Sequence, residues 1–261
     1  MSTVDRPAPH SPAVPPLVEG QRLDRATFHE RYLAMPPDVR AELVAGVVSM
    51  PSPLGYEHGA LDSNVSDWLG LYRCSTPGLG KALNATTILG DRTEVQPDLL
   101  LRLPEALGGT SRIEGGYVVG PPELVVEVAR TSRALDLGPK KDEYEQAGVS
   151  EYLFVGIDPD EVRWFARRDG RFTPLQAGPD GLLRSQVFPG LWLDPVTLLR
   201  GDLNALVAAL DRGLASPEHA AFVARLNRPN DWHTSTRSQG LRGDAVTGAP
   251  ASSPAVSAAG V

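Results

Sequence analysis

Two carboxylates lie within segments that are otherwise apolar. Asp98 belongs to the run 95–103 and Glu127 to the run 124–129, and both runs are rich in Val and Leu and set between Pro and Gly residues. Short runs of this kind are typical of buried strands. A carboxylate in a buried strand is costly unless it is paired or binds a cation. Asp98 and Glu127 are therefore candidates for one polar site.

The chemistry that suits such a pair is binding of Mg²⁺, with Mn²⁺ as a substitute. Mg²⁺ takes oxygen ligands, usually one or two carboxylates with waters and substrate phosphates. Asp98 and Glu127 would supply the carboxylates if their strands are neighbours, and the carbonyl of Val128 or Ala129 can add a ligand. A metal there would polarise a phosphodiester and lower the pKa of a water. Taken singly, however, a buried Asp is often held by backbone N–H groups, and a buried Glu often pairs with Arg.

Lysine is rare in this chain, and two of the three lysines, Lys140 and Lys141, follow Glu127 closely. They lie about 100° apart around a helix axis, so only one can face the acids. Lys140 shares a helix stripe with Asp136 and Tyr144, so we expect Lys140 to face the site and Lys141 to face solvent or a DNA phosphate. A lysine there can orient or deprotonate a water and stabilise developing charge. Asp136 and Lys140 at i, i+4 can also be a simple ion pair.

Further elements must position these residues. We expect a helical segment over 17–36 with Asp24 or Thr27 as its cap, a hairpin over 41–53 with its turn at Gly46, and a strand over 83–89. Leu61, Val65, Trp68, Leu69 and Tyr72 form one stripe of an amphipathic helix.

The glycine-rich segment 104–122 matches no phosphate-binding motif, and we interpret it as a flexible connection. Beyond it we expect a helix over 134–147 that ends at Gly148 and a buried strand over 152–157. The segments 162–166, 171–175 and 182–186 alternate with Asp-Gly turns, which predicts a C-terminal antiparallel meander, and a last helix covers 203–214.

These elements predict an α/β fold, a mixed sheet with helices on its faces. Residues 17–228 form one predicted domain, between a Pro-rich tail at 1–16 and a Ser/Ala/Gly/Pro-rich tail at 229–261, both expected to be disordered. The net charge of −7 argues against a nonspecific nucleic-acid binder with a basic patch but not against an acidic metal site. The single cysteine excludes a disulfide framework. No membrane span or signal peptide is evident, so we expect a cytoplasmic protein.

The central stretch also carries a longer pattern. It contains Pro97-Asp98, then Pro122-Glu123-Leu124-Val125-Val126-Glu127-Val128, then Asp136, Lys140, Tyr144, Gly148, Val149, Glu151 and Tyr152. This pattern resembles the Uma2 family, a branch of the PD-(D/E)XK restriction-endonuclease-like superfamily. Weaker similarities are Glu42-Leu43 in the opening hairpin, His58 at the start of the next helix, and Phe188-Pro189-Gly190-Leu191.

The resemblance implies a restriction-endonuclease-like mixed sheet, Asp98 and Glu127 as metal ligands, and Lys140 as the catalytic lysine. The superfamily's lysine usually lies two residues after the acid, where this chain has Ala129, so the lysine has moved to the following helix. The chain also departs from the family at Arg130, where Ser is frequent, and at Leu153, where Trp is frequent.

Six residues rank lower as site candidates. Glu42 is a candidate third acid, although an acid at a strand end is more often solvated. His58 is a candidate base or ligand, although a single His at a helix start is more often a cap or surface residue. Glu123 is a candidate for an acid that holds the metal ligands in place without binding the metal itself. Asp136 can simply pair with Lys140, and Lys141 can face solvent or a DNA phosphate. Tyr144 is more easily explained as a core residue than as a catalytic one.

We therefore expect a Mg²⁺-dependent endonuclease that acts on DNA, without a membrane partner and with homodimer formation left open. One alternative is a catalytically inactive nuclease-fold protein that binds nucleic acid or a protein partner. A second alternative is a structural α/β module of a toxin–antitoxin or mobile-element system.

Overall fold

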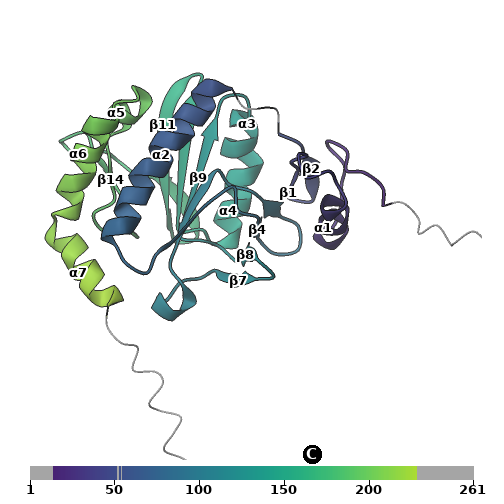
Figure 1. The fold of residues 1–261 in the computed structure, drawn as a ribbon, viewed down its shortest axis with the longest axis horizontal. Helices are drawn as coiled ribbons and strands as arrows, with labels where there is room; N and C mark the ends of the chain where they lie inside the picture. The colour runs from purple at the N-terminus through teal and green to yellow at the C-terminus, as the bar shows by residue number, and fades with distance from the viewer. Residues whose placement is uncertain (1–13, 52, 54, 228–261) are drawn as a thin grey trace, which may run out of the picture. The chain divides into compact units, whose positions relative to one another are not determined.

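The computed structural model describes residues 14–51, 53 and 55–227 (Figure 1). The predicted tails, 1–16 and 229–261, lie outside this part of the chain except for residues 14–16. All the elements below belong to the unit 1–228. No helix in the described ranges is long and apolar enough to cross a bilayer.

The two strands expected to carry the acids are neighbours in a mixed six-stranded sheet. Strand β9 (Leu124–Ala129) is buried along its whole length, and it pairs antiparallel with β6 (Leu99–Arg102) and parallel with β10 (Glu151–Ile157). Parallel neighbours need a long crossover, which residues 130–150 supply with helical segments. The sheet order is β12-β11-β10-β9-β6-β3, with β3 (Gly80–Leu83), β11 (Asp160–Arg168) and β12 (Arg171–Pro174). The predicted mixed α/β sheet is confirmed.

Helix α2 (Tyr56–Ser75) covers one face of this sheet (Figure 1). Four residues of its predicted stripe are buried and Leu61 is partly buried, and the stripe packs in one core with Leu124, Val126 and Val128 of β9. Three C-terminal helices join the same core beside α2: α5 (Pro195–Leu199), α6 (Leu203–Leu214) and α7 (Pro217–Leu226).

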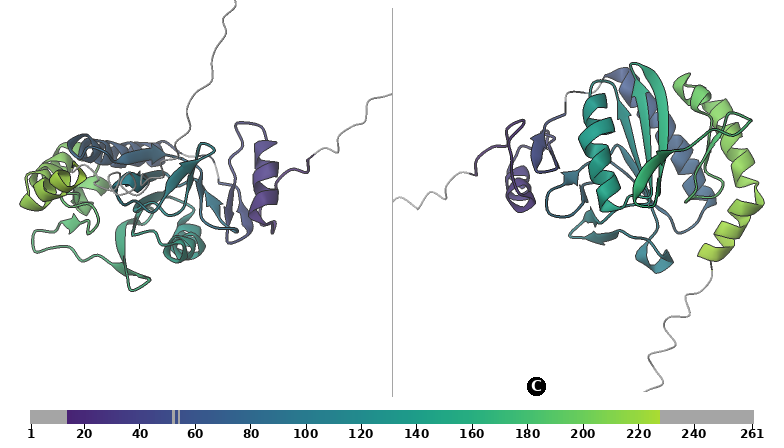
Figure 2. Two further views of the ribbon diagram at one scale, coloured as in Figure 1. Left: turned by 90° about the horizontal axis from the view of Figure 1, so that it is seen from below. Right: turned by 180° about the vertical axis from the view of Figure 1, so that it is seen from behind.

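Helix α4 (Lys141–Ala147) covers the opposite face, as the view from behind shows (Figure 2). Tyr144 of α4 packs in a second core with Val125 and Ala129 of β9. Successive strand residues point to opposite faces. Glu127, which lies between Val125 and Ala129 in this alternation, therefore points toward α4.

A second six-stranded sheet runs in the order β2-β1-β5-β4-β8-β7. Its strands are β1 (Glu42–Val44), β2 (Val47–Ser49), β4 (Thr87–Ile88), β5 (Glu94–Val95), β7 (Arg112–Glu114) and β8 (Tyr117–Val119). Helix α1 (Arg25–Leu33) packs on the β1–β2 hairpin through Phe28, and Asp24 caps it by accepting from the Thr27 N–H. The predicted hairpin is confirmed, and α1 is shorter than expected.

The segment 104–122 corrects a prediction. It is not one flexible connection, because it holds a short 3₁₀ turn (Glu105–Leu107) and the β7–β8 hairpin. Gly115 and Gly116 form the hairpin turn with positive φ angles of 59° and 89°, a conformation that glycine adopts without strain. Strand β8 then pairs parallel with β4, which the local sequence pattern does not reveal.

Two predicted strands are each divided between the two sheets. The run 95–103 forms β5 in one sheet and β6 in the other, with 96–98 passing between them, and the run 83–89 is divided in the same way between β3 and β4. Pro97 cannot donate a ladder hydrogen bond, and Asn84 has a positive φ of 48°, so both runs leave regular pairing here. Asp98 therefore lies at the junction of the sheets.

The C-terminal strands also differ from the predicted three-segment meander. Strands β11 and β12 form the expected antiparallel hairpin. The third segment forms β13 (Leu183–Arg184), which pairs with β14 (Trp192–Leu193) rather than with β12.

Candidate active site

A cleft of about 750 Å³ opens at the junction of the two sheets. Its lining includes residues from β1, from the 96–98 link, from β9, from α2 and from the crossover after β9: Glu42, Gln96, Asp98, Glu127, His58, Asp136 and Lys140. Five elements distant in sequence thus meet in one hollow.

Strand pairing sets Asp98 close to Glu127. Leu100 pairs with Val125 and Leu99 with Val126, so the next pair in this antiparallel register would be Asp98 with Glu127. The Asp98 carboxylate turns along β9 and accepts a hydrogen bond from the N–H of Val128 at 2.7 Å through Oδ2. Burial and, secondly, the charge of Asp62 raise the pKa of Asp98 to about 7, although the Val128 hydrogen bond opposes this rise.

The crossover helix is interrupted, which corrects the prediction of one helix over 134–147. It consists of α3 (Arg133–Leu135), a wide π-type turn at Asp136–Lys140 and then α4. Gly138 has non-helical angles (φ −110°, ψ −110°), and Pro139 has no N–H for a helical hydrogen bond. The turn still carries Asp136 and Lys140 into the cleft. Gly148 ends α4 in the left-handed conformation, as expected.

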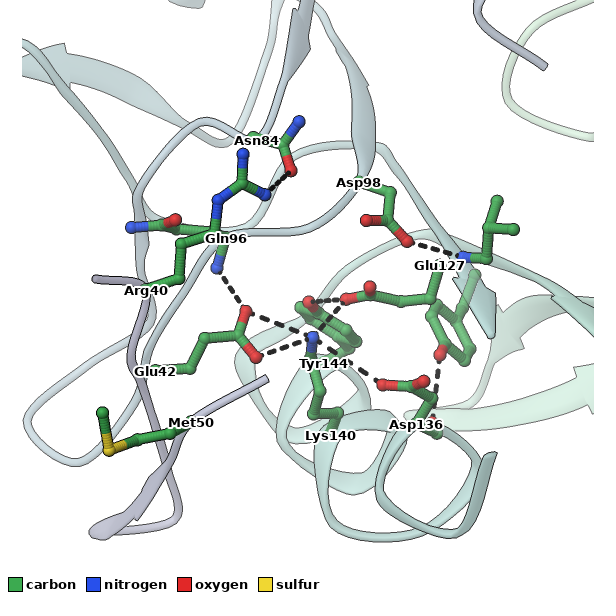
Figure 3. Close-up of polar contacts among 12 residues, drawn as sticks. Arg40, Glu42, Met50, Asn84, Gln96, Asp98, Glu127, Asp136, Lys140 and Tyr144 are labelled. Atoms are coloured by element: carbon green, nitrogen blue, oxygen red, sulfur yellow. Dashed lines mark hydrogen bonds and ion pairs between the residues drawn. The ribbon is translucent and has the colours of Figure 1, made fainter. Parts of the chain in front are cut away.

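Lys140 is the centre of the polar cluster (Figure 3). Its Nζ lies 2.8 Å from Oε1 of Glu127, and it donates to both carboxylate oxygens of Glu42 at 3.0 and 3.2 Å. Asp136 Oδ1 lies at 3.7 Å, and the Lys140 side chain is only 4% exposed. The structure therefore places Lys140 against the carboxylates.

Two neighbours hold the carboxylates of this cluster in place. The Tyr144 hydroxyl donates to Oε1 of Glu127 at 2.6 Å, and the N–H of Gln96 donates to Oε1 of Glu42 at 2.6 Å. Tyr144 and Glu42 are both buried, so the alternative of a solvated Glu42 is wrong. The 96–98 link thus holds Glu42, and α4 holds Glu127.

Charge is unevenly balanced in this cluster. Burial alone would lower the pKa of Lys140, but Glu127, Glu42 and Asp136 outweigh burial and raise the pKa well above its usual range. The ammonium therefore stays charged near neutral pH. Burial raises the pKa of Glu127 well above its usual range and raises that of Asp136, against the opposing charge of Lys140. If Glu42, Glu127, Asp136 and Asp98 were all ionised, their negative charge would exceed the positive charge of Lys140. Burying such an excess is unfavourable unless a proton or a cation binds to the cluster.

His58 enters the cleft from the first turn of α2. It is 5% exposed, so it is not the cap or surface residue that its position suggests. Its Nε2 lies 3.9 Å from Oδ2 of Asp62 and 4.0 Å from Oδ1 of Asp98. Burial lowers the pKa of His58, which favours the neutral imidazole, and burial raises the pKa of Asp62 to about 6.

Three candidates from the sequence do not line the cleft, and one of them, Tyr144, contacts it only through Glu127. Glu123 is buried elsewhere, where it accepts from the N–H groups of Leu103 at 2.6 Å and Thr110 at 3.0 Å and so orders the start of the 104–122 segment. Lys141 corrects a prediction, because it lies over the rings of Phe165 and Phe172, 5.1 and 5.8 Å from their centroids, on the α4 side of the sheet. Its position one residue beyond Lys140 turns it away from the acids.

Comparison with known proteins agrees with the motif and the fold. A family model described as "Uma2: Putative restriction endonuclease" matches residues 27–196. The chain belongs to the Uma2 family. A crystal structure described as "a putative nuclease belonging to DUF820 from Anabaena variabilis" superimposes with a TM-score of 0.51 and 16% identity, covering 66% of this chain and 97% of the other, which shows a shared fold. No curated protein matches significantly.

The Uma2 match covers 27–196, so it contains every residue that lines the cleft and excludes α6 and α7. These two helices pack in the core that contains α2. The two departures from the family pattern are in different places. Arg130 lies at the cleft and pairs with Glu57 across 2.9 Å, with half of its side chain exposed. Leu153 is fully buried in the core with α2, so the replacement of the family's frequent Trp by Leu changes the packing of this core.

The sequence did not point to several polar residues in or beside this Uma2 cleft, among them Asp62, Arg40 and Asn84. Asp62 lies four residues after His58, and this helical spacing was the signal that could have found it. Arg40 and Asn84 line the cleft and are joined by a hydrogen bond of 3.1 Å (Figure 3). Arg40 follows no motif, and Asn84 lies where the predicted strand 83–89 is interrupted.

Proposed function

We propose that this Uma2 protein is a divalent-metal-dependent endonuclease that hydrolyses DNA phosphodiester bonds with Asp98, Glu127 and Lys140. The observation that carries the proposal is the excess of carboxylates over cations in the cleft. Lys140 is within 3.7 Å of three acids, and Asp98 lies beside them. A buried excess of negative charge of this kind suits a hard divalent cation.

The donor set fits such a cation. Asp98 uses Oδ2 for the Val128 N–H, which leaves Oδ1 directed toward the cleft residue His58. Both contacts of Glu127, to Lys140 and from Tyr144, are made through Oε1. Asp98 and Glu127 are therefore the proposed ligands for Mg²⁺ or Mn²⁺. When bound, the metal would supply Lewis-acid polarisation of the phosphodiester.

Lys140 would act mainly through its positive charge. Its three carboxylate neighbours favour the ammonium form, so it suits electrostatic stabilisation of the charge that develops on the phosphate better than removal of a proton. Glu42 and Tyr144 would act as positioning residues, because Glu42 holds the ammonium and Tyr144 holds the Glu127 carboxylate.

Cations at the cleft support a phosphate-containing substrate. Arg40 and Arg130 both line the cleft and are exposed, while the buried floor is acidic. Guanidinium groups bind phosphate with paired hydrogen bonds. Together with the restriction-endonuclease description of the family, this arrangement favours DNA as the substrate.

Incubation of supercoiled plasmid with the protein tests the proposal. We expect nicking with Mg²⁺ or Mn²⁺, none with EDTA, and none with the Asp98→Asn variant. Wild-type protein that binds DNA and the metal but leaves plasmid, single-stranded DNA and RNA intact would contradict the proposal and favour the inactive nuclease-fold binder.

A further inference from the structure

His58 presents a buried nitrogen atom that has no hydrogen-bond partner. Its Nε2 has almost no exposed surface, and the side chain is 6% exposed. A buried polar atom without a partner destabilises the folded state, so it calls for an explanation. Its nearest acidic oxygens, on Asp62 and Asp98, are at 3.9 and 4.0 Å, which is too long for a hydrogen bond. A direct ion pair therefore does not satisfy this nitrogen.

The spacing of these groups suits ligands of one ion. One donor atom from each of His58, Asp62 and Asp98 lies within 4.8 Å of the other two, and no other group of three His, Cys, Asp or Glu donors in the described residues does so. Ligands at about 2.1 Å from an octahedral ion lie roughly 3 Å apart when adjacent and roughly 4.2 Å apart when opposite. The two N···O distances, 3.9 and 4.0 Å, lie between these values, so small side-chain shifts would bring the three groups to adjacent or opposite positions around one ion.

Local structure holds the three residues in this arrangement. His58 and Asp62 are one turn apart on α2, so their side chains share a helix face. The Val128 N–H holds Oδ2 of Asp98, which leaves Oδ1 as the oxygen nearest His58. Asp62 also has a buried oxygen, Oδ1, with no hydrogen-bond partner. Two unsatisfied polar atoms therefore belong to the same small cluster.

We propose that His58, Asp62 and Asp98 together bind one divalent cation, and that the imidazole makes this site prefer Mn²⁺ to Mg²⁺. Imidazole nitrogen suits first-row transition metals, whereas Mg²⁺ prefers an all-oxygen shell. The inference rests on the proposed function in that it names the groups that complete the metal site around Asp98. Glu127 remains a proposed ligand of the same ion through its other carboxylate oxygen, because its Oε1 already contacts Lys140 and Tyr144.

Metal titration of the full chain by calorimetry tests this inference without a nuclease assay. Wild-type protein should bind one Mn²⁺ more tightly than Mg²⁺. His58→Gln and Asp62→Asn should each weaken Mn²⁺ binding at least tenfold, and His58→Gln should remove the preference for Mn²⁺. Asp67→Asn, at an exposed position of the same helix, and His29→Gln, at a residue that pairs with Glu94 and does not line the cleft, are matched controls that should bind as wild type.

Melting temperatures without metal show whether each variant folds, and Asp62→Asn preserves the test if His58→Gln does not fold. Normal Mn²⁺ binding by both folded variants, with loss of binding in Glu127→Gln, would overturn the inference in favour of a site between Asp98 and Glu127. That result would leave the proposed nuclease activity intact. Conversely, metal binding that depends on His58 in a protein that cleaves no nucleic acid would support this site and contradict the nuclease function.

Discussion

Lys140 Nζ and Glu127 Oε1 lie 2.8 Å apart, although Lys140 comes from the interrupted crossover helix and Glu127 from the middle of β9. The position two residues after Glu127, on the same face of β9, holds Ala129, which is packed in the core with Tyr144. A charged side chain at 129 would be buried in this apolar core, which is costly unless it is paired. The wide turn at Asp136–Lys140 delivers the ammonium to the carboxylate from the facing helix instead.

Replacing Lys140 with Met should destabilise the fold. The change leaves Glu42, Glu127 and Asp136 without their shared cation, and an uncompensated buried charge costs on the order of 3 kcal/mol. Lys141→Met removes only a cation–ring contact and should cost less than about 1 kcal/mol. Urea unfolding of the two variants measures the difference. Equal stability of the two would show that Lys140 does not neutralise the cluster.

Replacing Tyr144 with Phe tests the support of Glu127. The hydroxyl donates to a buried carboxylate oxygen that Lys140 also contacts, and loss of a hydrogen bond to a charged group costs about 1.5–3 kcal/mol. We expect lower stability and a reduced rate of any metal-dependent cleavage, with DNA binding unchanged. Tyr152→Phe is the comparison, because its hydroxyl donates to the backbone carbonyl of Asp136. A larger loss of cleavage in Tyr152→Phe would contradict the positioning role of Tyr144.

Glu151 should make stability depend on pH. Burial raises its pKa from 4.5 to about 7, against hydrogen bonds from the N–H groups of Gln186 and Val187 and the hydroxyl of Ser185. The folded state therefore binds the Glu151 proton more tightly than the unfolded chain does. Its contribution to the free energy of unfolding falls by on the order of 3 kcal/mol as pH rises from about 4.5 to 7.

Glu151→Gln should flatten this part of the stability curve, whereas Glu30→Gln, at an exposed position of α1, should leave it unchanged. Denaturant unfolding at several pH values compares the three proteins. Parallel curves for wild type and Glu151→Gln would rule out this titration.

Local patterns predicted a large part of the fold. The stripe on α2 and the apolar run of β9 depend on side-chain periodicity, which survives in the sequence, and both are buried as expected. Helix geometry alone also distinguished Lys140 from Lys141, because residues one apart point in different directions even where the helix is interrupted.

Long-range pairing accounts for most of the errors. Strand β8 pairs with β4 some thirty positions away, and the division of one apolar run into β5 and β6 depends on which sheet each half joins. Neither pairing leaves a local periodic signal. Asp62 is a related case: its helical spacing from His58 is visible in the sequence, but this spacing indicates a metal site only once Asp98 is placed beside the pair.

The most direct test of the central claim is plasmid cleavage by the Lys140 and Lys141 variants under identical metal conditions. Lys140→Met should lose cleavage by orders of magnitude, and Lys140→Arg should also fail, because a planar guanidinium does not replace a compact ammonium between Glu42 and Glu127. Lys141→Met should retain cleavage. Retained cleavage by folded Lys140→Met, or its loss in Lys141→Met alone, would contradict the assignment of this cleft as the nuclease active site.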